Sequence, residues 1–567
     1  MFSMRSRALW ALFSSSLVHG ELATQNPNLS LPPGSYESRD AVVVMFKRSY
    51  ESYRLVKYAW GHDDLLPLNN SMSLQHLGTP RLNLTVFKGF TDTRNGWGAT
   101  IVDAMSTMYI MGLDDYFKEA VAHVSDIDFS QSKTDDTVSV FETTIRYLGG
   151  MLSAYELSGD SKLLEKSRHL ADNLIHAWTG NNDIPWSHLD FTSNEPVVGT
   201  SNIAEAGTLT IEFGILSKYT QNPKYRNLAE RAPAPLPGLP AQGIDPATGK
   251  AVGGYVTWGG GSDSYFEYLI KYPRLFDDAE DFFVDSWRLA VDSSIKTLLQ
   301  ISTSGKHAYL GDYDGETKRI KHVSSHLECF HGGNWILGGS ILRNQTIVDI
   351  GLELVDECWN TYASTATGIG PETFAYVPEG GDYTGEEKPT AQQLEFNEQH
   401  GFYPTASHYV LRPEVLESNF YAWRNTGDPK FIARAATALK SFTDYLSSKE
   451  AYSGLWDVNN KNSKRINDME SFWFAEVLKY LYLTFDDPQR ISLDEYVFNT
   501  EAHPFKLSPP KDHYGSSGFP TPTSSKPFRA NQGNTPEISQ VAVADMPSIK
   551  DIVQGGQDHV VQMILNQ

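Results

Sequence analysis

The sequence has few cysteines and no excess of positive charge. Among 567 residues only Cys329 and Cys358 are cysteines, and 47 lysines and arginines face 69 aspartates and glutamates, a net charge of −22. A chain with this negative charge is repelled by nucleic acids and by anionic membrane surfaces. We therefore expect neither as a partner. Two lone cysteines offer too few ligands for a metal site, and in a secreted chain they most simply form one disulfide.

Long hydrophobic runs are also missing. A membrane-spanning helix needs about 20 consecutive apolar residues, whereas the apolar stretch at 8–18 is shorter. It follows Arg5 and Arg7 and precedes Gly20, a pattern typical of a secretory signal peptide over residues 1–20, with an uncleaved anchor as the weaker alternative. We therefore expect no stable transmembrane span and a place in the secretory pathway, either secreted or in the lumen of the Golgi or endoplasmic reticulum. Glycosylation sequons, which fit this route, begin at Asn28, Asn69, Asn83 and Asn344.

The chain shows no alternation of strands with helices, no phosphate-binding loop and no dinucleotide-binding motif. Apolar residues instead recur with helical spacing, which predicts a mainly helical chain of about fourteen helices. Bundles, solenoids and α/α barrels can all bury such helix faces, and periodicity alone does not choose among them. The longer helices are predicted at 38–59, 101–112, 138–158, 161–179, 201–219, 277–303, 345–363, 428–449 and 464–485, and shorter ones at 114–124, 223–231, 262–273, 331–342 and 411–426.

Three segments lack this periodicity. Residues 232–250 and 377–395 are rich in proline and glycine, which predicts long loops. Residues 507–548 are rich in proline, serine, threonine and glycine, which predicts a disordered or loosely attached tail over 506–567.

Several carboxylates lie inside strongly apolar or aromatic segments. Burying a carboxylate is costly without a partner, whereas glycoside hydrolysis requires a pair of carboxylates that flank the scissile bond. The aromatic neighbours would also suit the faces of sugar rings. These carboxylates are Glu142, Asp263, Glu267, Glu414, Glu417, Glu470, Glu476 and Glu501.

Each of these sites also has a purely structural interpretation. Glu142 and Arg146 are four residues apart and could form an ordinary ion pair on a helix surface. Glu414 follows a proline and could favour a helix N-terminus. Asp263 follows three glycines and a serine and could cap a helix, while Glu476 could lie on the solvated edge of an amphipathic helix. Taken singly, none of them identifies a function.

Taken together, the segments resemble glycoside hydrolase family 47, the class I α-1,2-mannosidases. They occur in the family's order, cover most of residues 38–505, and resemble the secreted filamentous-fungal branch most closely. The matching segments are RNGWGATIVDAMSTMYIMGL (94–113), VFETTIRYLGGMLSAYELSGD (140–160), GGGSDSYFEYLIK (259–271), SHLECFHGG (325–333), TGIGPE (367–372), LRPEVLESNFYAWRNTGD (411–428), DMESFWFAEVLKYLYLTF (468–485) and VFNTEAHPF (497–505).

The resemblance implies an all-α fold: an (αα)7 barrel over the catalytic domain, residues 38–505, plugged by a C-terminal hairpin that carries FNTEAHP. Thr500 matches the threonine that binds Ca²⁺ through its carbonyl and hydroxyl oxygens. Water and sugar hydroxyls would complete the shell of six to eight oxygens. Thr500 alone would supply few of these ligands, so the surrounding carboxylates would have to hold the coordinating waters.

The resemblance also assigns the catalytic carboxylates. Glu142 matches the general acid, acting through a water, and Glu414 matches the general base that activates the attacking water. Asp263 matches a third essential carboxylate, and the choice of acid between it and Glu142 stays open. The family inverts anomeric configuration, which requires acid and base ~6.5–9.5 Å apart. Calcium would bind the 2- and 3-hydroxyls of the terminal mannose and hold a distorted ring.

Further positions carry over as substrate-binding residues, and Cys329 and Cys358 match the family's disulfide. Gly261 stands where the single-mannose-trimming enzymes of the endoplasmic reticulum have arginine, so we predict removal of several mannoses from high-mannose N-glycans and glycoproteins by a monomer. The alternatives are a weakly active mannose-binding or degradation-lectin relative on the same barrel, and an unrelated helical-barrel hydrolase or lyase. The substrate-binding residues are Arg146, Glu205, Gly261, His326, Arg412, Pro413, Glu417, Phe472, Glu476 and Glu501.

Overall fold

The computed structural model describes residues 23–55, 59–68, 89–179, 184–226, 238–379, 383–385, 387–449 and 451–516. The predicted signal peptide, the sequons at Asn69 and Asn83 and the tail after residue 516 lie outside these residues. Within them, no helix combines the length and the apolar character that a membrane span requires.

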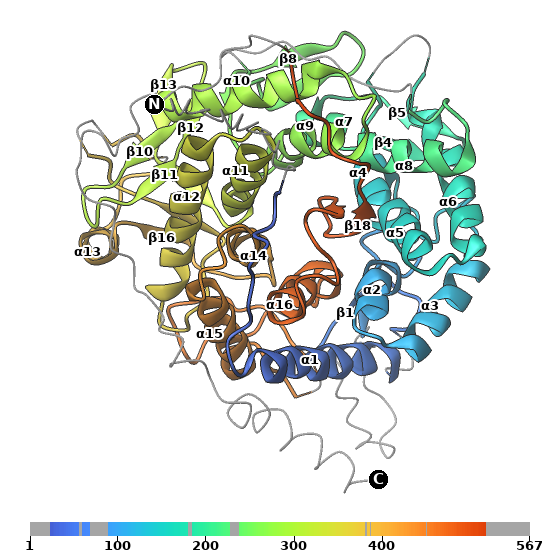
Figure 1. The fold of residues 1–567 in the computed structure, drawn as a ribbon, viewed down its shortest axis with the longest axis horizontal. Helices are drawn as coiled ribbons and strands as arrows, with labels where there is room; N and C mark the ends of the chain where they lie inside the picture. Colours follow the sequence, from blue (N-terminus) through green and yellow to red (C-terminus); the bar gives the residue numbers. More distant parts are fainter. Residues whose placement is uncertain are drawn as a thin grey trace, which may run out of the picture.

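Helices form a closed ring around a central axis, which confirms the prediction of a mainly helical chain (Figure 1). In this view α2, α5, α9, α11, α14 and α16 face the centre, and α1, α3, α6, α10, α12 and α15 lie outside them. The helical elements are α1 Ser35–Leu55, α2 Ala99–Ile110, α3 Asp114–Asp126, α4 Val140–Glu142, η1 Thr143–Leu148, α5 Gly149–Ser158, α6 Ser161–Leu174, η2 Ile175–Ala177, α7 Ile203–Gly207, α8 Thr210–Thr220, α9 Asp263–Leu275, α10 Asp281–Thr297, η3 Leu327–Cys329, α11 Phe330–Ile341, α12 Gln345–Ala363, α13 Ala391–His400, α14 Glu414–Thr426, α15 Lys430–Tyr445, η4 Trp473–Val477 and α16 Leu478–Phe485.

Inner and outer helices differ in how they are buried. In α2 every residue except Tyr109 is buried, because an inner helix packs against neighbours on all sides. In α3 only Phe117, Ala120, Val121 and Val124 are buried. Their spacing of three and four residues gives one apolar stripe facing the inner ring.

Short strands connect the helices and form small antiparallel sheets. Four of these sheets have three strands, and two of them, β3-β4-β5 and β6-β7-β8, contribute lining residues to the candidate site described below. The strands are β1 Asp64–Leu65, β2 Phe90–Thr91, β3 Val138–Ser139, β4 His188–Asp190, β5 Glu195–Val197, β6 Ser201–Asn202, β7 Gly243–Asp245, β8 Lys250–Val252, β9 Tyr255–Val256, β10 Leu299–Ile301, β11 Ala308–Leu310, β12 Asp312–Asp314, β13 Arg319–Lys321, β14 Val323–Ser325, β15 Thr373–Ala375, β16 Tyr403–Ala406, β17 Tyr496–Phe498 and β18 Pro504–Lys506.

Several predicted elements have different bounds in the structure. The helix predicted at 464–485 begins only with η4, and the one predicted at 277–303 ends with α10 and continues as β10. The described part of 223–231 is a turn, and the loop predicted at 377–395 already contains the start of α13. The predicted helix at 201–219 is broken between α7 and α8, since Thr208 and Leu209 leave the helical conformation.

The packed body extends beyond the predicted catalytic domain at both ends. The backbone amides of Thr24 and Gln25 donate to Asp494 Oδ1 at 2.6 and 3.2 Å, well before residue 38. Past residue 505, Tyr514 is buried and the Ser516 amide donates to Asp285 Oδ1 at 3.0 Å. The first residues of the predicted tail therefore pack on the helices rather than hanging free.

A hairpin of β17 and β18 lies inside the ring of helices (Figure 1). Asn499 fixes its turn: the side-chain amide donates to the Ile145 carbonyl at 3.1 Å and to Glu212 at 2.8 Å. A Cβ on Gly149 would lie only 2.7 Å from Asn499 Nδ2, so glycine at this position allows the hairpin to approach the helix. Lys479 donates to the Ala502 carbonyl at 2.6 Å from the opposite side.

The predicted disulfide is confirmed. Cys329 and Cys358 are joined across 29 residues and link η3 to α12. This link lies directly behind the segment that carries His326.

Candidate active site

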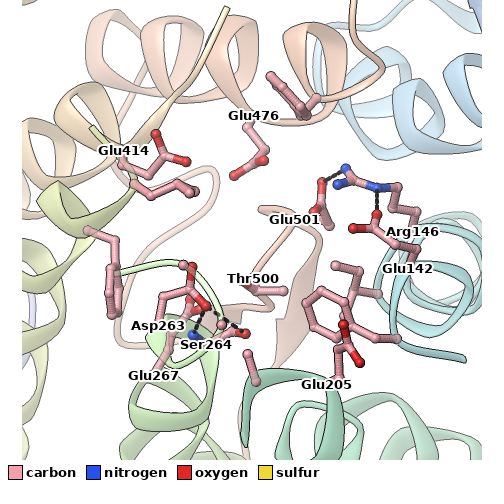
Figure 2. A pocket seen from close by; sticks show the side chains of 18 of the residues that line it. Glu142, Arg146, Glu205, Asp263, Ser264, Glu267, Glu414, Glu476, Thr500 and Glu501 are labelled. Carbon is pink, nitrogen blue, oxygen red and sulfur yellow. Dashed lines mark hydrogen bonds and ion pairs between the residues drawn. The ribbon is translucent and has the colours of Figure 1, made fainter. Parts of the chain in front are cut away.

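A cavity of about 590 Å³ opens inside the ring and gathers most of the predicted site residues. His326 does not line it and lies behind Glu414 instead. Figure 2 shows Glu142 and Glu414 on opposite sides of this cavity, with Thr500 between them. The predicted residues that line it are Glu142, Arg146, Glu205, Gly261, Asp263, Arg412, Pro413, Glu414, Glu417, Phe472, Glu476, Thr500 and Glu501.

Glu142 and Arg146 form an ion pair inside the barrel, not on a helix surface. Arg146 Nε donates to Glu142 Oε2 at 2.6 Å, and its Nη1 pairs with Glu501 on the hairpin. Arg146 lies in η1, a π-helical segment, and Glu142 is the residue immediately before it; such segments are frequent at functional sites. Burial acts to raise the pKa of Glu142, but the guanidiniums of Arg146 and Arg94 outweigh it and lower that pKa below its usual value.

Asp263 is the first residue of α9, whereas the capping position belongs to Ser262, whose side chain makes no capping hydrogen bond. The turn before it requires glycine at Gly261, where φ is +84°. Asp263 Oδ1 accepts from the Ser264 amide at 2.8 Å. Burial raises the pKa of Asp263 to about 7, with further contributions from the charges of Glu267 and Glu414.

Glu414 begins α14, as its proline neighbour predicted, and it also faces the cavity. The helix start thus directs the carboxylate into the cavity, so the structural interpretation is confirmed and the functional one stays a prediction. His326 Nδ1 lies 2.7 Å from Glu414 Oε2, and its Nε2 lies 2.8 Å from the Tyr362 hydroxyl. Because an ionised carboxylate only accepts hydrogen bonds, we assign the His326 proton to Nδ1. His326 therefore orients the carboxylate of Glu414.

Glu417 and Glu476 are buried carboxylates in the same cavity. Burial raises the pKa of Glu417 to about 8, opposed by Lys271 and supported by Glu267. Burial also raises the pKa of Glu476 well above its usual value, with Glu501 as the largest charge contribution. Lys271 is already paired with Glu267, so it does not stabilise the ionised form of Glu417 enough to offset burial.

Thr500 is at the tip of the hairpin, and its amide donates to the Tyr268 hydroxyl at 3.3 Å. Among the described residues, no group of three or more histidine, cysteine, aspartate or glutamate side chains is placed to hold a metal directly. Thr500 could offer oxygen ligands to a hard cation such as Ca²⁺, with the surrounding carboxylates reaching the ion through water. Such an ion would stabilise the ionised forms of Glu417 and Glu476 and so lower their raised pKa values.

Sequence reasoning missed several supporting residues. Arg94 pairs with Asp64 at 2.6 Å and with Glu470 at 2.7 Å, and it lies 3.8 Å from Glu142. Glu372 pairs with Arg412 at 2.7 Å. Arg94 and Glu372 lie within the motifs 94–113 and 367–372. A search for the residue that balances each charged side chain of these motifs would have identified both.

The comparisons with known proteins agree with this geometry. The model of glycosyl hydrolase family 47 matches residues 45–507. The probable mannosyl-oligosaccharide alpha-1,2-mannosidase 1B of Aspergillus clavatus is 38% identical over 534 residues, covering 88% of this chain and 98% of that protein. The mannosyl-oligosaccharide alpha-1,2-mannosidase 1B of Emericella nidulans is 39% identical over 502 residues, covering 83% and 93%.

Among solved structures, the alpha-1,2-mannosidase from Trichoderma reesei superposes with a TM-score of 0.76 at 35% identity, covering 83% of this chain and 99% of that one. This likeness confirms the helical-barrel class of the fold. Family model, sequence relatives and solved structure all span the carboxylate-lined cavity, and the chain belongs to glycosyl hydrolase family 47.

Proposed function

We propose that this protein is a mannosyl-oligosaccharide α-1,2-mannosidase that inverts configuration while it removes terminal mannose from high-mannose N-glycans. The observation that carries the proposal is the placement of Glu142 and Glu414 on opposite sides of one cavity (Figure 2). Inversion needs an acid on one face of the sugar and a base with its water on the other. The names of the relatives with 36–39% identity support the substrate class.

Glu414 is the base in this proposal. His326 holds one of its oxygens by donating from Nδ1, and Tyr362 fixes the other ring nitrogen. The second carboxylate oxygen is thereby aimed into the cavity, where it takes the proton of the attacking water. The catalytic geometry is set by packing before the substrate arrives.

The proton donor is Glu142 or Asp263, and the surroundings of the two differ. Glu142 faces two guanidiniums, which keep its pKa low, so it delivers a proton only by polarising a water. Asp263 has a pKa of about 7, so a large share of its carboxyl groups carries a proton in neutral solution. We therefore propose that Asp263 holds the proton and that Glu142, across the cavity from Glu414, orients the water that delivers it.

Calcium at Thr500 is part of the proposal. The ion would supply coordination for two neighbouring hydroxyls of the terminal mannose, and its charge would favour the ionised forms of Glu417 and Glu476. The residues that would hold it are Thr500 directly, and the carboxylates around it through water.

The proposal also covers the number of helix pairs, the oligomeric state and the cellular location. We infer seven helix pairs closed by the β17–β18 hairpin as a plug, a monomer, and a chain that enters the secretory pathway. The ring of helices and the hairpin inside it (Figure 1) support the first point. Light scattering of the purified chain tests the second, and secretion of a tagged chain tests the third.

The decisive experiment measures mannose release from α-1,2-mannobiose with and without a chelator. We expect release that stops with the chelator and returns with Ca²⁺. Binding of mannose without hydrolysis would support the mannose-binding alternative, and hydrolysis that ignores chelation would contradict the Thr500 site.

A second experiment follows products from a nine-mannose glycan. Gly261 carries no side chain, so nothing from this position projects beside Asp263, and a Cβ there would lie only 2.9 Å from Gln242 Nε2 and would displace that side chain. We expect several mannoses to be removed in sequence. A clean stop after one mannose would contradict the role of Gly261.

A further inference from the structure

A second cavity, of about 650 Å³, lies beside the first one. Both cavities are lined by Gly260, so the glycine turn at 259–261 forms the wall between them. Gln242 lines the second cavity from behind this turn and donates from Nε2 to the Gly260 carbonyl at 2.7 Å. The partition is therefore one backbone turn and one amide side chain, and a branched ligand could reach both cavities at once.

The walls of the second cavity come from the sheets β13-β12-β9 and β14-β15-β16 and from the start of α13. Most lining side chains carry hydroxyls or amides, which both donate and accept hydrogen bonds, and tyrosine rings add apolar surface. This combination suits a neutral polyhydroxylated ring. The hydroxyl, amide and tyrosine side chains are Gln242, Tyr255, Thr257, Ser324, Ser325, Thr373, Tyr383, Thr390, Gln393, Tyr403 and Thr405.

The charged groups of the cavity argue against an anionic ligand. Asp312 and Glu328 line it together, and a bound phosphate or carboxylate would add a further negative charge beside these buried carboxyl groups. Lys388 is balanced in formal charge by Glu387 beside it in the chain. A sugar hydroxyl can donate to either buried carboxylate without adding charge.

Only part of the hydrogen-bonding capacity of Glu328 is used within the described part of the protein. Its side chain is buried, with 1% of the residue exposed, and Oε2 accepts from the Ser324 hydroxyl at 2.8 Å. Oε1 has no hydrogen-bond partner among the described residues. Because a buried polar atom without a partner costs free energy, a ligand that satisfies Oε1 gains from doing so. Burial and nearby Asp312 also raise the pKa of Glu328.

We propose that the second cavity is an accessory sugar subsite that binds a non-scissile mannose from another branch of the same oligosaccharide, while the terminal mannose occupies the carboxylate-lined cavity. The shared wall at Gly260, the hydroxyl-rich lining and the incomplete hydrogen bonding of Glu328 carry this proposal, and it rests on the proposed mannosidase function. The catalytic carboxylates do not line the second cavity. We therefore expect a disaccharide bound in the first cavity to be hydrolysed without occupying the second.

The test fills the subsite and compares two substrates. Thr405 is exposed on β16 and lines the second cavity, so Thr405→Trp places a large side chain in it. We expect kcat/KM for a nine-mannose oligosaccharide to fall about tenfold, mainly through KM, as for the loss of one or two hydrogen bonds. Turnover of α-1,2-mannobiose should stay at the wild-type level. Thr192→Trp, at an exposed turn away from both cavities, is the control for a surface tryptophan.

A second variant guards against misfolding of the first. Thr373→Val keeps the side-chain shape but removes the hydroxyl that lies 2.7 Å from that of Thr405, and we expect the same selective loss at a few-fold size. Equal losses on both substrates, or no loss on the branched one with either variant, overturn the subsite while leaving the mannosidase intact. A wild-type chain that releases no mannose from either substrate defeats the proposed function itself, and the subsite with it.

Discussion

The two walls of the catalytic cavity contain the same chemical groups in opposite electrostatic settings. On one wall Glu142 stands between Arg146 and Arg94, whose charges lower its pKa. On the other wall the cations are used elsewhere, since Lys271 pairs with Glu267 and Arg412 with Glu372. Asp263 and Glu417 on this wall therefore have raised pKa values, of about 7 and about 8.

This difference shows how one barrel can hold carboxylates with distinct roles. Glu142 lies near two guanidiniums and stays ionised, whereas a buried carboxyl whose nearest cation is shared or paired elsewhere keeps a raised pKa. Glu501 shows the shared case, since it pairs with Arg146 beside Glu142 and its pKa is about 8. Both walls combine carboxylates with cationic side chains, so residue types alone do not predict the difference. The four predictions below test this contrast, from the largest expected effect to the smallest.

Removing the base should have the largest effect. Glu414→Gln keeps the shape and the contact with His326 but cannot take a proton, so we expect kcat on α-1,2-mannobiose to fall about 10³-fold. Glu165→Gln, at an exposed position on α6, is the matched control and should keep full activity. Turnover of Glu414→Gln within a few-fold of wild type would refute the role of Glu414.

Breaking the cationic wall should cost stability. Arg94 has a side chain only 13% exposed and holds Asp64 and Glu470, so Arg94→Met leaves two carboxylates unpaired. We expect the free energy of unfolding, measured with urea, to drop by about 3 kcal/mol. Arg54→Met is the control, because its pairs with Glu51 and Glu119 are exposed and contribute at most about 1 kcal/mol. Similar losses for both variants would show that the Arg94 network has no special weight.

The proton donor can be identified from the pH profile of kcat/KM. If Asp263 carries the proton, activity is present below its pKa of about 7 and falls as the pH rises through that value, since the raised pKa means loss of the proton there. Asp263→Asn should lower activity about 10²-fold and abolish this alkaline limb. Glu142→Gln should keep the limb. A limb that vanishes with Glu142→Gln instead would assign the proton to Glu142.

The smallest effect concerns the hairpin between the two walls. Thr500→Ala removes the proposed hydroxyl ligand but keeps the carbonyl, and we expect calcium affinity, followed by thermal shift, to weaken about tenfold. Chelation should lower the melting temperature of the wild type more than that of this variant. Thr192→Ala, at an exposed turn, is the control, and an unchanged calcium response in Thr500→Ala would remove Thr500 from the site.

The helices of the barrel were largely predictable, but the breaks near the site were not. Residues 138–158 have helical periodicity throughout, yet the structure divides them into β3, α4, η1 and α5. The wider π-helical turn at η1 coincides with the contact of Arg146 with the hairpin, some 355 residues later in sequence. A local pattern carries no information on a contact so remote.

The sequence by itself determined the helical class, the disulfide and, through its ordered motifs, the family and the identity of every carboxylate that lines the catalytic cavity. Tertiary structure alone decided which of these carboxylates meet a cation, because Arg94 and Arg146 reach Glu142 while Lys271 and Arg412 are held by other partners. It also decided that the turn at Gly260 forms a wall between two cavities. The physical reason is that pKa values and cavities depend on distances between segments far apart in the chain, and these distances are set by packing around the ring.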